Sequence, residues 1–360
     1  MGTDGRTRVA TAPNSEATPH RAFASGQLEP GCGKLVVVIE VPHPRVELAG
    51  LPTPLEPLDR LTEAWGGPTI WVKRDDLTGF GLWGNKVRKL EYHLAAARDA
   101  GADHVLTCGA VQSNHCRATA LAAARVGLAC TLLLRSGEGR PPAEMTGNHL
   151  LQWLAGARFE FVTPAQYADR HARMATIAER HGSTWVIPEG ASDSLGTWAF
   201  ATAADELVDQ WDDLGIDADP IVWHAASSGS TTAGLSLGTA LRHRRWRIVA
   251  SSVGEPAERL AARIDGVRPA DQPWNRPELI DEYVGDGYGR ATPDELTIQA
   301  GTTALTGLLW DPTYTGKALA GLHRHIGSRR FGPDDHVVFW HTGGGFAAFA
   351  HEWSACAGEV

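Results

Sequence analysis

A run of small, mostly hydroxyl-bearing residues at positions 227–232 (SSGSTT) separates an apolar segment from a segment with helical periodicity. Small residues let the backbone approach a ligand closely, and the free amides at the start of a helix favour an anion such as phosphate. The run lacks the lysine of a nucleoside-triphosphate loop, which argues against that ligand. Polar turns between strands and helices are common, so the run alone leaves an ordinary turn open beside a phosphate-binding loop.

Two lysines, Lys86 and Lys89, stand at the start of another predicted helix, shortly after the extended, charged segment TIWVKRDDLTG. A lysine on a helix face is usually solvated, and that explanation holds for either residue taken alone. In a third loop, CGAVQSNHCR (108–117), the residues Ser113, Asn114 and His115 open a helix after a predicted strand. Serine and asparagine are good helix N-caps, which explains their presence without a ligand.

Two tyrosines, Tyr288 and Tyr314, each lie in a glycine-flanked turn (DGYGRATPDE and WDPTYTGKAL), where a buried tyrosine closing a loop is the alternative to a site residue. A further loop, WHTGGG (340–345), ends a predicted strand with three glycines. Glycine permits close backbone approach, which suits contact with a flat group.

The elements that position these loops follow a regular order from about residue 43. Short β-rich segments such as HVLTCG and PIVWHAASSG alternate with amphipathic, alanine-rich helical segments such as NHCRATALAAARVG. This alternation predicts crossover units and parallel sheets. The strands are too many for one small sheet, so we expect two α/β domains. Ligands of such folds bind beyond the carboxyl ends of the strands, where all the loops above are expected.

Composition narrows the class of protein. The 360 residues carry 33 Lys and Arg against 42 Asp and Glu, a net charge of −9 that argues against nucleic-acid binding. No apolar run approaches the ~20 residues of a membrane span. Five cysteines without a CxxC pair suit a reducing cytoplasm and predict neither a disulfide framework nor a metal site. Residues 1–42, rich in Gly, Pro, Ser and Thr, are predicted to be a disordered tail.

Six ordered motifs across residues 43–350 carry a resemblance: RDDLTG…GNKVRKLE, QSNHCR, SSGSTT, GYG, DPTYTGKA and HTGG. The sequence resembles the D-cysteine desulfhydrase and 1-aminocyclopropane-1-carboxylate deaminase family of pyridoxal-phosphate (PLP) enzymes. The resemblance implies the tryptophan-synthase β-like fold (fold type II), with two three-layer α/β domains and mostly parallel sheets. It also implies a large cofactor-binding domain of residues 43–86 and 199–360, a small domain of 87–198, an amino-acid substrate and a homodimer.

The resemblance assigns cofactor contacts to the loops. Lys86 would form the Schiff base with pyridoxal 5′-phosphate and later take a proton from Cα, whereas Lys89 would be an ordinary helix residue. The remaining cofactor contacts implied are Ser228, Gly229, Ser230 and Thr231 at the phosphate, with Thr232 as a neighbour, Asn114 or Asn85 at the ring hydroxyl, and Thr315 near the ring nitrogen.

The same resemblance places the substrate. Ser113, Asn114 and His115 would form its binding site, where Ser113 and His115 receive the carboxylate at a helix N-terminus. Ser113 is also a catalytic candidate. Tyr288 and Tyr314 would line the substrate side as proton donors or pocket walls.

Three positions bear on the reaction. The deaminase pattern has a glutamate after the DPxY tyrosine, where it keeps the pyridine nitrogen protonated, and this chain has Thr315. A hydroxyl cannot supply that charge, which suits β-elimination better than opening of a cyclopropane. His115 and Thr342, where the deaminase pattern has glutamine and tends to have leucine, favour the same branch. We therefore predict elimination from D-cysteine to pyruvate, ammonia and hydrogen sulfide.

Alternatives remain at this point. The chain resembles the deaminase too, and cysteate or another β-substituted amino acid would share the elimination mechanism. A non-catalytic binding module is disfavoured by the intact Lys86. Trp83 departs from the family's usual glycine, and it either packs against the small domain or narrows the pocket.

Overall fold

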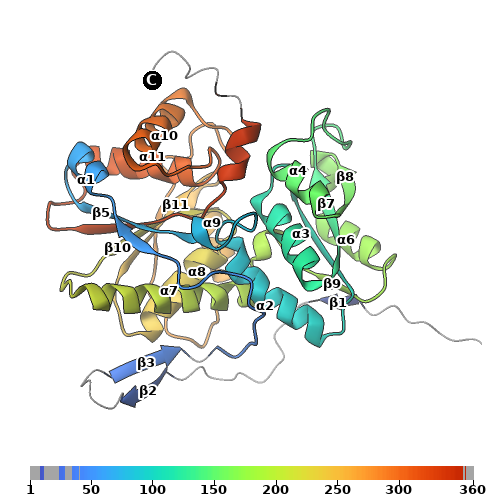
Figure 1. Cartoon of the computed structure of the whole chain (residues 1–360), viewed down its shortest axis with the longest axis horizontal. Coiled ribbons are helices and arrows are strands. Elements are labelled where there is room, and N and C mark those ends of the chain that lie inside the picture. Colours follow the sequence, from blue (N-terminus) through green and yellow to red (C-terminus); the bar gives the residue numbers. More distant parts are fainter. Residues whose placement is uncertain (1–8, 12–23, 29–34, 40, 352, 354–360) are drawn as a thin grey trace, which may run out of the picture.

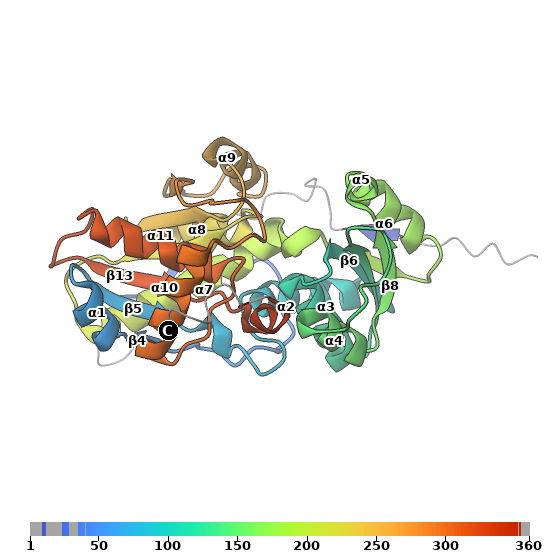
Figure 2. The same ribbon diagram turned by 90° about the horizontal axis from the view of Figure 1, so that it is seen from above.

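The computed structural model describes residues 9–11, 24–28, 35–39, 41–351 and 353, and it contains two sheets flanked by helices (Figure 1). Figure 2 shows the two sheets with their helices as two bodies joined side by side along the long axis of the molecule. The mixed α/β class predicted from the alternation of segments is confirmed.

The larger sheet has six strands in the order β12-β11-β10-β13-β5-β4, and only the β4–β5 pair is antiparallel. Its strands are β4 (Leu55–Pro57), β5 (Thr69–Lys73), β10 (Ile221–Ala226), β11 (Arg247–Ser252), β12 (Glu278–Ile280) and β13 (His336–Trp340). Every residue of β10 is buried, as expected of a parallel strand that is covered on both faces.

Helices cover both faces of this sheet. They are α1 (Asp59–Trp65), α7 (Ser194–Leu214), α8 (Ser230–Leu241), α9 (Ala257–Asp265), α10 (Pro293–Thr306) and α11 (Thr315–Gly327). Because successive strand residues point to opposite faces, Trp223 of β10 packs with α1 and α11, and Val222 packs with α7 and α8. The sheet is therefore the middle layer of three.

The smaller sheet has the order β1-β9-β6-β7-β8, and all its pairs are parallel. Its strands are β1 (Val9–Thr11), β6 (His104–Ala110), β7 (Ala129–Arg135), β8 (Arg158–Val162) and β9 (Thr184–Val186), and its helices are α2 (Lys86–Asp99), α3 (Asn114–Val126), α4 (Gly147–Leu154), α5 (Pro164–Tyr167) and α6 (Arg170–Ala178). One core contains α2 and α3, and another contains α6, on the opposite face. Short 3-10 turns lie at η1 (Asp75–Leu77), η2 (Glu189–Ala191) and η3 (Gly345–Ala350).

The predicted tail of residues 1–42 lies mostly outside the described residues. Within it, the structure describes β1, which pairs with β9, and an antiparallel hairpin of β2 (Ala24–Leu28) and β3 (Leu35–Ile39). The helices formed by the described residues include none that is both long and apolar enough to cross a bilayer.

A buried ion network joins the strand, turn and helices on which the site is built. Arg88 of α2 pairs with Asp75 (Nη2–Oδ1 2.8 Å) and with Glu206 of α7 (Nη1–Oε2 2.9 Å). Lys73, at the end of β5, also pairs with Glu206. Burial alone would raise the pKa of Glu206, but the hydrogen bonds and charges of Arg88 and Lys73 lower it to about 2. The network fixes α2, and with it Lys86, against the larger sheet.

We expect Glu206→Gln to lower the free energy of unfolding by about 3 kcal/mol at pH 7, because two buried cations then lose a partner. The carboxylate has a lower pKa in the folded protein than its ordinary 4.5, so its stabilisation is present above pH 4.5 and is lost as the pH falls toward 2. Urea unfolding followed by tryptophan fluorescence should show the difference from wild type shrinking across that range. Glu63→Gln, at an exposed site of α1, is the control; a difference that stays constant down to pH 3 would contradict this account.

Candidate active site

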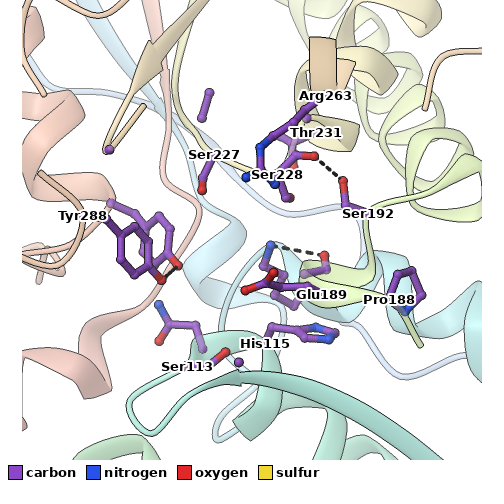
Figure 3. Close-up of a pocket in the computed structure, with 18 of the residues that line it drawn as sticks. Ser113, His115, Pro188, Glu189, Ser192, Ser227, Ser228, Thr231, Arg263 and Tyr288 are labelled. Carbon is purple, nitrogen blue, oxygen red and sulfur yellow. Dashed lines mark hydrogen bonds between the residues drawn. The ribbon is translucent and has the colours of Figure 1, made fainter. Parts of the chain in front are cut away.

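A cavity of about 550 Å³ lies between the two sheets, and both contribute to its walls. The loops that follow β6, β9, β10, β11 and β13 reach it, as does the last residue of β7, so it sits beyond the carboxyl ends of parallel strands as the sequence predicted. Figure 3 shows side chains from both halves of the chain pointing into this space.

Lys86 is the first residue of α2 and lines the cavity. Its Nζ lies 3.4 Å from the carbonyl oxygen of Gly190. Burial lowers the pKa of Lys86 to about 8, although the negative charge of Glu189 opposes this shift. A larger fraction of the amine is therefore unprotonated near neutral pH than in an exposed lysine, and an unprotonated amine is a nucleophile and a base.

The glycines beside Lys86 have a structural explanation. Gly84 has φ 119°, and a Cβ there would lie 2.6 Å from the carbonyl oxygen of Thr342. Gly84 and Gly343 form an isolated antiparallel bridge, and a Cβ on Gly343 would lie 2.5 Å from Cα of Gly84. The sequence predicted that the glycines of the WHTGGG loop let the backbone approach a flat group. At Gly343 the backbone instead approaches Gly84, in the turn that carries Lys86.

The SSGSTT run leaves β10 and opens α8, with Ser227, Ser228, Gly229, Thr231 and Thr232 lining the cavity. Ser192 fixes the loop, because its hydroxyl donates to the Ser228 carbonyl (2.6 Å) and accepts from the Ser230 amide (3.1 Å). Small side chains and a helix N-terminus together favour an anion at this wall.

Ser230 and Lys89 form a pair behind the loop. Lys89 donates to Ser230 Oγ (2.8 Å), and neither residue belongs to the described cavity wall. The expectation that Lys89 is an ordinary helix residue is corrected, since its side chain is fully buried and lies over the Phe200 ring. Burial, and then the nearby charge of Lys86, lower its pKa well below 10.5.

Ser113, Asn114 and His115 all line the cavity at the start of α3. Ser113 is the N-cap, and its hydroxyl accepts from the Cys116 amide (3.2 Å), so the capping explanation holds together with a place in the wall. His115 is buried with Nε2 2.7 Å from Thr107 Oγ1, and its Nδ1 has no hydrogen-bond partner in the described part of the chain. Burial, and then the charge of Lys86, lower the pKa of His115 well below 6.5, which keeps the imidazole neutral.

The two asparagines predicted to face the cofactor also line the cavity. Asn114 accepts a hydrogen bond from Asn148 (2.9 Å), which holds its amide in place. Asn85 lies 3.4 Å from Thr231 Oγ1 and so links the start of α2 to the anion loop.

Tyr288 and Tyr314 meet at the cavity wall, with their hydroxyls hydrogen-bonded to each other. Burial raises the pKa of Tyr314 well above 10, so its hydroxyl remains a donor at neutral pH. Two tyrosines from separate turns, which the family resemblance assigned to the substrate side, lie together at the cavity wall.

Thr315 and Trp83 are not among the described residues that line the cavity. The Thr315 hydroxyl donates to Asp311 (2.9 Å), and its amide donates to the same oxygen (2.7 Å), so the side chain closes the start of α11. Burial raises the pKa of Asp311 to about 6, although the hydrogen bonds from Thr315 oppose this. Trp83 packs edge-on against Phe346 of η3, with ring centroids 4.7 Å apart, which favours packing over narrowing of the pocket.

Several wall residues were not predicted from the sequence. Glu189 lies beside Lys86 and accepts from the Tyr167 hydroxyl (2.8 Å), and Arg135 and Arg170 both lie over the Tyr167 ring. Arg263 of α9 stands beside the anion loop (Figure 3). Arg135 ends a strand and Glu189 follows one, so the rule that ligands bind at carboxyl ends marks the places where they stand, although it does not single out these side chains.

The residues present fit a phosphorylated carbonyl cofactor. A buried amine of lowered pKa and a helix-terminal anion loop face one cavity, and Gly229, with φ 102°, lets that loop lie against the backbone of α9 beside Arg263. An amine can form an imine with an aldehyde, and the loop suits a phosphate. Fold and site together thus define a class of α/β enzymes that hold such a cofactor on a lysine.

Comparison with known proteins names the cofactor. Residues 46–343 match a family described as pyridoxal-phosphate dependent enzyme. The chain belongs to this family, which confirms the family, the enzyme class and pyridoxal phosphate as cofactor.

Relatives share most of the chain. A D-cysteine desulfhydrase of Klebsiella pneumoniae is 37% identical over 321 residues, covering 86% of this chain and 96% of the relative. A putative 1-aminocyclopropane-1-carboxylate deaminase of Thermotoga maritima is also 37% identical, covering 85% and 98%. A crystal structure described as an ACC deaminase homologue superposes with a TM-score of 0.76 at 33% identity, covering 88% of this chain and 96% of the other. An O-ureido-L-serine synthase, with a TM-score of 0.62 at 16% identity, shares the fold.

Proposed function

We propose that the protein catalyses α,β-elimination from a β-substituted amino acid, with D-cysteine as the first substrate to test and pyruvate, ammonia and hydrogen sulfide as products. The observation that carries the proposal is Lys86: its amine, whose pKa is lowered to about 8, lines the same cavity as the anion loop at the start of α8. The 37% identity to a D-cysteine desulfhydrase over most of both chains supports this choice of substrate.

Pyridoxal phosphate, when bound, supplies a sink for the electrons left behind when Cα loses its proton. In the proposed mechanism Lys86 holds the cofactor and later serves as the base that takes the Cα proton. Ser228, Gly229 and Thr231 hold the phosphate at the α8 N-terminus, and Asn114, with Asn85 as second candidate, binds the ring hydroxyl. Ser230 takes part in this scheme through its backbone, because its hydroxyl is engaged by Lys89.

The substrate carboxylate, in this scheme, binds at the start of α3. Ser113 and His115 lie at that helix terminus, where backbone amides and the helix dipole favour an anion. Tyr314, whose hydroxyl stays protonated at neutral pH, and Tyr288 act as proton donors or as the wall of the substrate side.

Cyclopropane deamination is the second candidate, because a putative deaminase is equally similar in sequence. Thr315 argues against it, because its side chain carries no charge and is hydrogen-bonded to Asp311. This position therefore offers no carboxylate that would keep a pyridine nitrogen protonated. His115 and Thr342, both at the cavity wall, differ from the deaminase pattern as well. Cysteate and other β-substituted amino acids remain alternatives within elimination.

The domain division, dimer and location also belong to this proposal. A large domain of 43–86 and 199–360 and a small domain of 87–198 agree with the two sheets, although residue 198 lies inside α7. A homodimer is supported by exposed apolar side chains near α4 and η3, among them Phe80, Trp153, Leu154 and Phe349. Three buried free cysteines suit a cytoplasmic protein.

The test compares two substrates on the holoenzyme. We expect the enzyme to release sulfide and pyruvate from D-cysteine. We expect it to form 2-oxobutyrate from 1-aminocyclopropane-1-carboxylate at no more than about a hundredth of that rate, because one well-placed catalytic group contributes a factor of that order. Faster turnover of the cyclopropane would reverse the choice of branch. If none of D-cysteine, 1-aminocyclopropane-1-carboxylate and 3-chloro-D-alanine releases ammonia, the proposed elimination is refuted.

A further inference from the structure

Arg135 is a wall residue that the proposed mechanism leaves without a role. It is the last residue of β7, half-buried, and lines the cavity. Its partner in the sheet register is Ala110 of β6, the strand that leads into Ser113. Arg135 therefore stands at the same sheet edge as the proposed carboxylate site, one strand further along.

The other guanidinium groups of the cavity wall have carboxylate partners. Arg170 pairs with Glu189 (Nε–Oε2 3.2 Å), and Arg263 pairs with Glu255 (Nη2–Oε1 2.6 Å). Arg135 forms no ion pair with any described residue, and its recorded contact is with the Tyr167 ring, 5.3 Å from the centroid. A cation at a partly buried wall is disfavoured unless an anion compensates it, so a ligand anion would be bound favourably here.

Arg135 and Tyr288 line the same cavity from the two halves of the chain. Arg135 ends β7 of the smaller sheet, and Tyr288 lies in the turn between β12 of the larger sheet and α10. In the proposed scheme Tyr288 belongs to the substrate side, so Arg135 borders that side from the other half of the chain. The anion loop of α8 and the start of α3 already account for the phosphate and the α-carboxylate.

We propose that Arg135 binds an anionic β-substituent, so that the preferred substrates are amino acids bearing a sulfonate or a phosphate ester on Cβ. This inference rests on the proposed elimination and narrows its substrate. A planar guanidinium matches both groups with paired hydrogen bonds, and it matches the side-chain carboxylate of aspartate, which cannot leave and so serves as an unreactive ligand. Tyr167, held by Glu189, supports the guanidinium from its ring face.

Elimination from such a substrate needs no further reactant. With a sulfonate, the Cβ–S bond breaks with its electron pair going to sulfur, the Cα proton passes to Lys86, and the group leaves as sulfite. The departing group gains a negative charge, so Arg135 binds it more strongly as the bond breaks than before.

The binding test uses the wild-type holoenzyme and three variants, titrated by the cofactor's absorbance with aspartate and with 2-aminobutyrate, each as both enantiomers. These ligands share the α-carboxylate and differ in the β-anion. We expect wild type to bind one enantiomer of aspartate at least tenfold tighter than the matching 2-aminobutyrate. Arg135→Gln should remove most of this ratio, Arg135→Lys should keep part of it, and Arg140→Gln, an exposed cation on the following loop, should keep all of it.

Two results would overturn the inference. One is equal binding of aspartate and 2-aminobutyrate by wild type, which needs no variant to fold. The other is an equal loss for both ligands in Arg135→Gln, since that would place the shared α-carboxylate at Arg135.

Turnover separates this inference from the proposed function. Wild type should release pyruvate from cysteate or O-phosphoserine with a kcat/KM at least equal to that for D-cysteine, and the two substrates distinguish sulfonate from phosphate. Pyruvate from D-cysteine or 3-chloroalanine, with less than a tenth of that kcat/KM on both anionic substrates, would refute the inference alone. Pyruvate from none of the four would refute the elimination.

Discussion

Lys86→Ala is expected to abolish the visible absorbance band of lysine-bound cofactor and to lower elimination by more than about a thousandfold, while the protein stays folded. The residue supplies two functions in the proposed mechanism, the covalent attachment and the base. Among the described lysines, Lys86 is the one that lines the cavity. Lys73 pairs with Glu206, and Lys317 donates to the carbonyls of Val284 and Gly287.

Two further variants sharpen this prediction. Lys86→Arg keeps a positive charge but cannot form an imine, so it should lose the band as completely as alanine does. Lys89→Met should retain the band, because the Lys89 amine points to Ser230 behind the loop. Circular dichroism and thermal unfolding check that each protein is folded, and a borohydride-reducible band in Lys86→Ala would assign the cofactor to another lysine.

The loops that form the cavity were predictable because the strand–helix alternation is strong and parallel strands end at a common edge. Tyr288 and Tyr314, far from each other along the chain, could be expected in one site only from the resemblance, and the structure places their hydroxyls in contact. Arg135 and Glu189 went unpredicted because an arginine or glutamate after a strand is ordinary in sequence, and its significance depends on which groups it faces.

Side-chain direction accounts for the remaining differences. Lys86 and Lys89 are three residues apart on α2, which puts them on nearly the same helix face. Since Lys86 faces the cavity, Lys89 lies about one turn further along the same face, where its amine donates to Ser230 of α8. Lys89 is therefore buried, and the solvated position that is usual for a lysine on a helix does not apply to it. Ser230 and Thr315, the first residues of α8 and α11, direct their hydroxyls to Lys89 and Asp311. The Lys89 contact joins residues far apart in the sequence, and the Asp311 contact depends on the conformation of the turn before α11, so neither could be predicted from the motif alone.

Gly229 is the position where the structure predicts the second large effect. Its φ of 102° lies in a region of backbone conformation that residues other than glycine rarely adopt. A Cβ there would lie 3.0–3.1 Å from backbone atoms of Arg263 and Ile264, which belong to α9 and cannot move without moving the helix. A branched side chain therefore displaces the anion loop from α9 and spoils the geometry of the α8 N-terminus.

We expect Gly229→Val to weaken binding of pyridoxal phosphate at least tenfold and to lower the free energy of unfolding by about 1–3 kcal/mol, the cost of strained backbone. The matched control is Gly266→Ala, because Gly266 lines the same cavity with φ −70° and its nearest neighbour to a new Cβ is 3.4 Å away. Equilibrium dialysis with pyridoxal phosphate and with pyridoxal separates phosphate binding from general damage to the site. The valine variant should lose affinity mainly for the phosphorylated form. An equal loss for both forms would mean that the substitution disrupts the cavity as a whole, and unchanged affinity for pyridoxal phosphate would place the phosphate away from residues 227–232.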